Sequence, residues 1–213
     1  MIISIDFVGG IPPIEGATHT VAMAAGETAG VKPATHWNSA ATNVGTLSSL
    51  VLADGTASSA SANWNVPLPS GQPRVTFSLY WTDAPGNVRM MNGFLDPVAI
   101  ASPATINVAG LPSPMSAGYD VYVYCYGNMT TAATRPSRYT IGSTTHNTIQ
   151  TGPMATTFGG YVLAPEGGAG NYIVFRNVTG TGFTLTAQPM TGSTDQMFRA
   201  PVNGIQIVYP AGS

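Results

Sequence analysis

Aromatic side chains beside amide side chains are the residues of this chain whose types and spacing suit a definite chemistry, the recognition of sugars. A flat ring can stack on the C–H face of a pyranose, and a neighbouring amide can fix the pattern of its hydroxyl groups. Trp64 lies between Asn63 and Asn65, and Trp37 precedes Asn38. These two clusters are candidate ligand-binding sites. The alternative is that each tryptophan belongs to the core, where large aromatic side chains are common.

A third candidate is a row of tyrosines in the segment YDVYVYCYG, residues 119–127. Side chains of a strand alternate between two faces, so one face carries Tyr122, Tyr124 and Tyr126, and the other carries Val121, Val123 and Cys125. The apolar face suits a core, with Cys125 as a small buried hydrophobic residue. The tyrosine face either packs under a second layer or meets a ligand together with Arg138.

Metal binding has weaker support. A calcium ion needs several oxygen ligands from one or two loops, and Asp6, Glu15 or Asp195 could supply carboxylates beside backbone carbonyls. The alternative is that these are turn and capping residues. The three histidines are widely spaced and match no metal-binding motif. The sequence therefore indicates no certain cofactor, with a structural calcium ion as the one candidate.

Catalysis has still weaker support. The sequence contains no Gly-x-Ser-x-Gly nucleophile elbow. Glycosidases need two carboxyl groups that face each other across a cleft, and the chain has only nine Asp and Glu residues. Asp83, Asp96 and Asp120 lie near the ends of expected strands, but no pair is indicated. Trp81 shares a strand face with Phe77 and Leu79, which predicts that it is part of the core.

The composition limits the partners. Charged residues make up 8% of the 213 residues and the formal net charge is −2, with Lys32 as the single lysine. Nucleic acid and anionic membranes are bound by clusters of cationic side chains, so neither is expected as a partner. No apolar run reaches the roughly 20 residues of a membrane span. The start of the chain reads as a strand and not as a signal peptide, although the composition favours a secreted or cell-surface protein.

The hydrophobic pattern predicts an all-β protein. About ten short strands with turn signals between them, and no useful helical period, indicate an antiparallel β-sandwich of the jelly-roll type in one domain, residues 1–213. The first strand, Ile3–Phe7, is expected beside the last, Ile205–Val208. Thr179–Thr181 is expected to form a tight hairpin. The expected strands are Ile2–Val8, Ala57–Val66, Arg74–Trp81, Ala104–Val108, Tyr119–Gly127, Arg138–Ile141, Thr156–Leu163, Asn171–Val178, Gly182–Gln188 and Val202–Tyr209, and Ser48–Ala53 is a short apolar run closed by a turn signal at Asp54-Gly55.

Several segments resemble the galactose-binding-like jelly rolls, above all the malectin-type and carbohydrate-binding modules of secreted bacterial proteins. They are the opening ISIDFVGG, the central YDVYVYCYG with the following RPSRYTIG, and the closing APVNGIQIV. The pieces NWN and GNVRMMNGFLD also look like modules that recur in large surface proteins of environmental bacteria. The resemblance covers about half of the chain, and residues 11–70 fit it poorly. It implies a jelly roll, sugar binding by loops or by a concave sheet, and a structural calcium ion.

Three functions follow, in order of preference. The first is a non-catalytic carbohydrate-binding module of an extracellular bacterial protein, with a glycan or polysaccharide as its partner. The second is a structural domain of a surface layer, filament or adhesin, because low charge and abundant Thr and Ser suit self-association. The third is a polysaccharide-active hydrolase.

Overall fold

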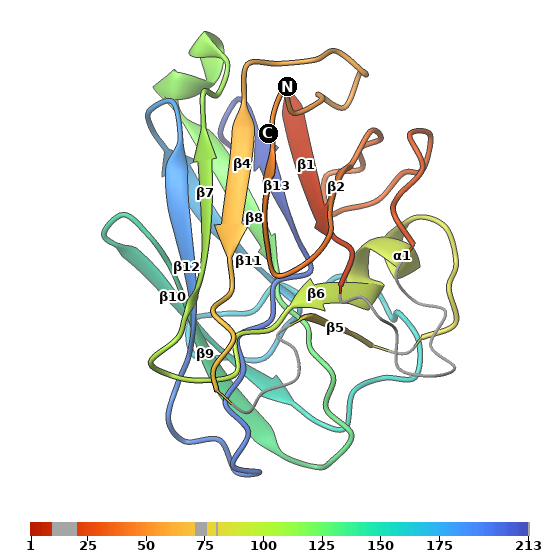
Figure 1. Cartoon of the computed structure of the whole chain (residues 1–213), viewed down its shortest axis with the longest axis vertical. Coiled ribbons are helices and arrows are strands. Elements are labelled where there is room, and N and C mark those ends of the chain that lie inside the picture. Colours follow the sequence, from red (N-terminus) through yellow and green to blue (C-terminus); the bar gives the residue numbers. More distant parts are fainter. Residues whose placement is uncertain (10–20, 71–75, 80, 213) are drawn as a thin grey trace.

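The strands form two sheets that face each other, as Figure 1 shows. The structure is a computed structural model that describes residues 1–9, 21–70, 76–79 and 81–212. One sheet has the order β11-β8-β13-β1-β2, the other β10-β9-β12-β7-β4-β3, and a small third sheet pairs β5 with β6. The first sheet consists of β1 (Ile2–Phe7), β2 (Asn38–Ala40), β8 (Tyr119–Tyr124), β11 (Tyr172–Val178) and β13 (Gly204–Val208). The second consists of β3 (Val44–Leu47), β4 (Ser61–Asn65), β7 (Ala104–Ala109), β9 (Thr134–Ile141), β10 (Thr144–Thr151) and β12 (Phe183–Pro189).

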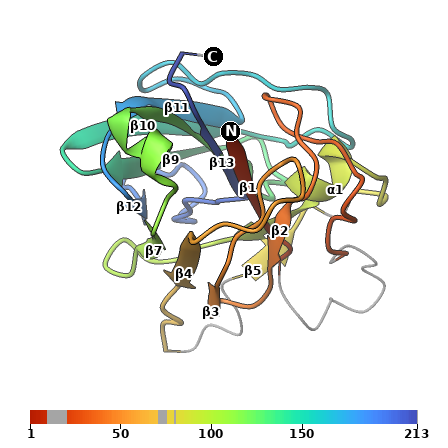
Figure 2. The same cartoon turned by 90° about the horizontal axis from the view of Figure 1, so that it is seen from above.

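The pairing confirms an antiparallel β-sandwich whose terminal strands are neighbours. β1 pairs antiparallel with β13, with Ile3 opposite Ile207, and the two ends of the chain lie close together in Figures 1 and 2. The short β2 is an exception, because it runs parallel to β1. A single domain over residues 1–213 stays a prediction. None of the helices in the described part of the chain is long and apolar enough to cross a membrane.

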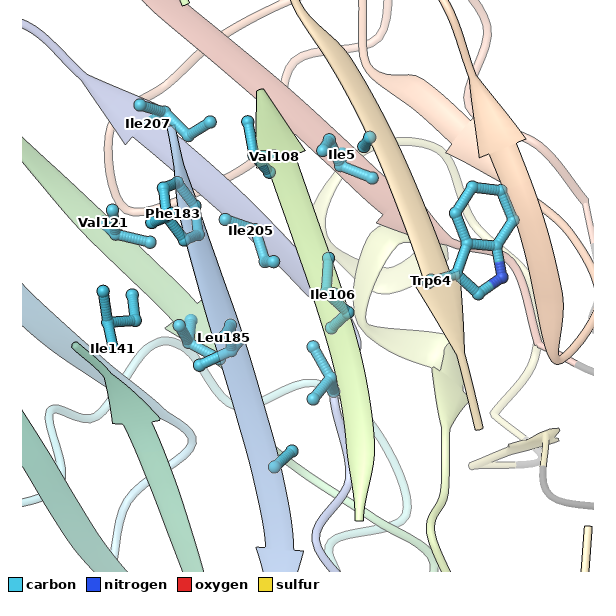
Figure 3. Close-up of a cluster of buried hydrophobic side chains, with 14 of the residues drawn as sticks. Ile5, Trp64, Ile106, Val108, Val121, Ile141, Phe183, Leu185, Ile205 and Ile207 are labelled. Atoms are coloured by element: carbon cyan, nitrogen blue, oxygen red, sulfur yellow. The ribbon is translucent and has the colours of Figure 1, made fainter. Parts of the chain in front are cut away.

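The space between the sheets is filled by branched aliphatic side chains, seen in Figure 3. The alternation of β8 directs Val121 and Val123 into this core, where both are fully buried. Cys125 continues the same row and is buried with a free thiol, as predicted. Burial raises its pKa to about 12, so the thiol stays protonated at neutral pH.

A second apolar cluster covers the opposite face of the same sheet. Tyr122 and Tyr124 lie in it together with Trp37, Trp81, Met90, Met91 and Phe94. The covering layer comes from coil segments, from α1 (Asn87–Asn92) and from the β5–β6 pair (Thr76–Ser78 and Gly93–Leu95). The tyrosine face was expected either to pack under a second layer or to meet a ligand. In the structure, Tyr122 and Tyr124 pack under a second layer. The prediction that Trp81 is part of a core is also confirmed.

Two secondary-structure predictions are wrong, and one strand was not predicted. Thr156–Leu163 forms no regular strand. Thr179–Thr181 is not a hairpin turn, because β11 and β12 belong to different sheets and the segment crosses between them. β10 was not predicted, yet it pairs with β9 from Thr144 to Thr151. Its side chains are mainly polar, so the hydrophobic pattern did not reveal it.

Close contact between β6 and the end of β1 depends on Gly93. A Cβ at this position would lie 2.3 Å from the carbonyl carbon of Val8, which is backbone and cannot rotate away. We expect Gly93→Ala to lower the free energy of unfolding by about 1–3 kcal/mol through overpacking, measured by urea denaturation. Gly26→Ala is the matched control, because nothing lies within 4 Å of its added Cβ. Equal stabilities of the two variants would contradict this packing.

Candidate functional site

The structure separates Trp64 from its two asparagines. Trp64 is 4% exposed and points between the sheets, as Figure 3 shows, with its ring 6.0 Å from that of Phe7. Its Nε1 donates a hydrogen bond of 3.1 Å to the carbonyl oxygen of Thr42. Asn63 and Asn65 are exposed, because successive side chains of β4 point to opposite faces. Trp64 is therefore a core residue and offers no open ring to a ligand.

Trp37 and Asn38 also have structural roles. Trp37 is 5% exposed, and its Nε1 donates to the carbonyl oxygen of Ala34 at 3.0 Å. The Asn38 amide donates to the carbonyl oxygens of Ser4 (2.9 Å) and Val51 (3.0 Å), while its oxygen accepts from the Val51 N–H at 2.8 Å. These contacts connect β1 and β2 to the segment after β3. The side chain of Asn38 is thus engaged within the fold.

The tyrosine row and Arg138 lie on opposite sides of the sandwich. Arg138 projects outward from β9 in the second sheet, where its Nε donates to Asn147 Oδ1 at 3.2 Å. Tyr124 is fully buried, and its hydroxyl donates to Gln206 Oε1. Burial raises the pKa of Tyr124 well above its usual value, so it remains a neutral phenol. Tyr126 alone in the row keeps partial exposure, because it lies beyond the end of β8.

The candidate calcium ligands do not converge. Asp195 accepts two N–H groups of Arg135 and the hydroxyl of Ser193, and the guanidinium holds the pKa of this carboxyl well below its usual range. Asp6 lies at the end of β1, apart from Asp195, and Glu15 lies outside the described residues. Among residues 1–9, 21–70, 76–79 and 81–212, no group of three His, Cys, Asp or Glu residues could hold a metal ion.

A groove with a volume of about 440 Å³ opens beside Tyr126. Its rings are Trp81, Tyr126 and Phe158: the indole lies 6.0 Å from the tyrosine ring and 6.2 Å from the phenylalanine ring. Trp81 is only 3% exposed and forms the floor, with its Nε1 donating to the carbonyl oxygen of Ala155 at 2.8 Å. Tyr126 and Phe158 are partly exposed and form the walls. Val162, 56% exposed, adds an apolar rim.

Amide side chains hold the groove in shape. Asn171 binds both sides of its loop: its amide donates to the carbonyl oxygen of Gly160 at 2.8 Å, and its oxygen accepts from the Val162 N–H at 2.8 Å. Gln150 exchanges two hydrogen bonds with the backbone of Gly127. The Ala155 N–H donates to the Tyr126 hydroxyl at 3.1 Å, which leaves the phenolic proton for another acceptor.

The loop behind the groove is fixed to the outer layer by Tyr161. Its hydroxyl donates to Asn87 Oδ1 at 2.7 Å and accepts from the Gly30 N–H at 3.0 Å. Its ring lies 4.9 Å from that of Phe158, edge to face, and 5.3 Å from that of Tyr124. Phe158 was not among the predicted ligand-binding residues, because residues 156–163 were predicted to form a strand. The pair Gly159-Gly160 beside Phe158 is a loop signal that could have found it.

The three carboxylates near strand ends have different surroundings. Asp83 binds Arg89 through two hydrogen bonds of 3.1 and 2.7 Å. Asp120 accepts from Arg176 and from the Asn177 N–H at 2.9 Å. Asp96 lines a separate pocket of about 190 Å³. No facing pair of the kind that a glycosidase uses is formed by these three groups.

Comparisons with known proteins assign the chain to no family. No family model matches the chain, and a search of curated proteins found no match. Among solved structures, the chain is similar to an exo-β-1,3-galactanase from Phanerochaete chrysosporium whose crystal structure was determined with galactose. The two are 13% identical, the alignment covers 75% of this chain and 32% of the galactanase chain, and the TM-score is 0.32. This structural similarity is weak and does not indicate a function.

Proposed function

We propose that the protein is a non-catalytic carbohydrate-binding module and that the groove walled by Tyr126 and Phe158 is its glycan site. The observation that carries the proposal is the partly exposed pair of rings over a buried indole, with the exposed hydroxyl groups of Thr151 and Thr157 beside them. Rings provide faces for the C–H groups of a pyranose, and hydroxyl and backbone groups provide hydrogen bonds.

Charge and size define the class of ligand. None of the residues that line the groove carries a charge, so its chemistry suits a neutral glycan better than an acidic one. The volume of about 440 Å³ lies in the range of small-molecule sites, roughly 300–1,000 Å³. The groove is formed by segments far apart in sequence that are fixed by Asn171, Gln150 and Tyr161, so it needs little ordering upon binding.

The proposal extends to the family and the location. We place the chain among the galactose-binding-like jelly rolls of secreted or surface bacterial proteins, on the strength of the strand segments quoted above and the sandwich. A chain with only 8% charged residues and abundant Ser and Thr supports an extracellular role. Cell fractionation of the source organism with an antibody against the protein tests the location: a purely cytoplasmic signal would contradict it.

Removal of a wall of the groove tests the sugar site. We expect Phe158→Ala and Tyr126→Ala each to weaken glycan binding about tenfold or more, because each deletes a stacking ring worth about 0.5–1.5 kcal/mol beyond its buried area. The measurements are retention on insoluble cellulose, chitin and xylan, and affinity electrophoresis in a panel of soluble neutral polysaccharides. Each is run with added calcium and with chelator, which also tests the structural calcium ion.

Controls separate the loss of binding from the loss of structure. Val44→Ala removes an exposed apolar side chain on β3, away from the groove, and should bind as the original protein does. Tyr126→Phe keeps the ring and removes the hydroxyl that accepts from Ala155. All variants should keep their unfolding temperatures within a few degrees. Failure of the original protein to bind any member of the panel would refute the sugar site.

Self-association is the second candidate function, favoured by strand β3. Within the described part of the chain, β3 pairs only with β4 and lies at the edge of its sheet, and Val44 is 58% exposed. Such edges can pair with another copy. Light scattering at increasing protein concentration decides: a monomer throughout excludes the assembly domain. A hydrolase is tested by activity screening on the polysaccharides of the same panel.

A further inference from the structure

A second, smaller pocket contains a buried carboxylate with an unused oxygen. Asp96, which directly follows β6, is 4% exposed, and its Oδ1 has no hydrogen-bond partner. Its Oδ2 lies 3.4 Å from Nε of Arg199. Both residues line a pocket of about 190 Å³ together with Phe77, Asn128, Thr130 and Arg135. A buried acceptor without a partner costs free energy, and a ligand that donates a hydrogen bond to this oxygen would remove that cost.

The charges around the pocket select a neutral ligand. Arg135 is neutralised by Asp195, with Nη2 and Oδ2 at 2.7 Å, and its Nη1 donates to the carbonyl oxygen of Asn128 at 2.6 Å. Arg199 and Asp96 then form a second pair of opposite charges. An anion would be repelled by Asp96, and a cation by Arg199. A hydroxyl group can bind to both side chains, because it donates a hydrogen bond to the Asp96 carboxylate and accepts one from the Arg199 guanidinium.

The pocket and the groove lie along the same two chain segments. Phe77 lines the pocket and Trp81 the groove, and likewise Asn128 lines the pocket and Tyr126 the groove. Tyr126 and Asn128 are two residues apart, and two residues of extended chain span at most about 7 Å, which is near the length of one sugar unit. On this short separation we base the expectation that a glycan on the rings of the groove reaches toward Asp96.

We propose that Asp96 and Arg199 form a subsite that binds neighbouring hydroxyl groups of a neutral sugar, next to the ring-lined groove. The pocket is too small for an oligosaccharide and suits a single sugar unit at the end of the bound chain. Arg199 is positioned for this task by Phe77, whose ring centre lies 5.6 Å from the guanidinium carbon. The assignment rests on the proposed glycan function and adds to it the side chains that select the sugar.

The test uses the methyl glycosides of glucose, galactose, mannose and xylose, titrated into the isotope-labelled full chain and followed by backbone amide NMR. We expect at least one of them to shift the amides of Asn128 and Thr130. Asp96→Asn should weaken this binding about tenfold or more, because a neutral amide oxygen replaces the charged acceptor of the hydrogen bond. Arg199→Gln should act in the same direction. Phe158→Ala, which alters the groove alone, should leave the pocket shifts in place.

The outcomes separate this subsite from the groove. Retention of polysaccharide by the groove, with Asp96→Asn binding as tightly as the original protein, overturns the subsite and leaves the proposed function standing. Pocket shifts without any retention support the subsite as a monosaccharide site and overturn the groove. Shifts by sulfate or calcium in place of the glycosides overturn the neutral-ligand assignment. Asp54→Asn, an exposed turn residue, is the control for loss of a carboxylate and should change neither readout.

Discussion

Trp64→Ala is expected to lower the free energy of unfolding by about 3–5 kcal/mol and to leave glycan binding by the folded protein unchanged. The side chain is 4% exposed, packs against Phe7 and donates to the carbonyl oxygen of Thr42. Gly45 lies directly against the indole, since a Cβ there would be 2.4 Å from Cζ2. Deletion of the ring would open a large cavity and leave the Thr42 oxygen without this donor.

Equilibrium urea denaturation measures the loss of stability, and retention on polysaccharide below the transition measures binding. Asn63→Ala and Asn65→Ala are the matched controls, because these neighbours on β4 are exposed and should change stability by less than about 0.5 kcal/mol. A stable Trp64→Ala protein with impaired binding would contradict the core assignment and return Trp64 to the ligand site.

Trp64 also shows where the sequence was misread. The same period of two that predicted the faces of Tyr122 and Val121 places Trp64 and its asparagines on opposite faces. The cluster of Trp64, Asn63 and Asn65 exists in the sequence but cannot exist on one face of a strand. Applying the rule to β4 would have predicted this result before the structure was known.

Strong apolar alternation made the central strands predictable. Ile3 and Ile207 belong to strands whose apolar rows are long enough to fix both faces, and their pairing was anticipated. β10 escaped because its sequence, TTHNTIQT, has no continuous apolar row. Short strands such as β2 depend on pairing with β1 and carry no pattern of their own.

The groove could not be predicted, because its walls come from distant segments. Trp81, Tyr126 and Phe158 meet only after the loop ending at Asn171 has folded over the outer face of β8. Tyr126 was among the predicted ligand-binding residues, but the reason was its membership of the tyrosine row. The other two members of that row, Tyr122 and Tyr124, are buried. A local sequence pattern does not predict this contact between distant rings. The contact depends on the coil segments that cover the first sheet and on the hydrogen bonds of Tyr161.

The buried charge of Asp96 gives the second large effect, a dependence of stability on pH. Burial raises the pKa of Asp96 from 3.8 to about 6, although Arg199 and Arg135 act in the opposite direction. The folded state therefore binds this proton more tightly than the unfolded state. The protonated form of Asp96 therefore stabilises the folded state. This stabilisation is fully present below about pH 4 and is lost as the pH rises through about 6. The total is about 3 kcal/mol, from a shift of roughly two units at 1.36 kcal/mol each.

Asp96→Asn removes the titrating group and should therefore show how much stability the fold loses when Asp96 ionises. Relative to the original protein, we expect the variant to become more stable by about 2–3 kcal/mol as the pH rises from 4 to 7, measured by urea denaturation at each pH. Asp195→Asn should show little change between pH 4 and 7, and below about pH 4 the opposite trend, because Arg135 lowers the pKa of Asp195 and the stabilisation by its ionised form is lost only as the pH falls below the unfolded pKa. A pH-independent difference for Asp96→Asn would show that the carboxyl is not buried as described.

A gain in stability from Asp96→Asn would bear on the function as well. Residues that serve a ligand often reduce the stability of the protein that carries them, and removing them then stabilises the fold. If the variant is more stable at pH 7 and also binds sugar less tightly, the unpaired oxygen is held in place for a ligand. If the variant is more stable at pH 7 and binds sugar equally well, Asp96 lowers the stability of the fold without contributing to binding. The small pocket then has no part in sugar recognition.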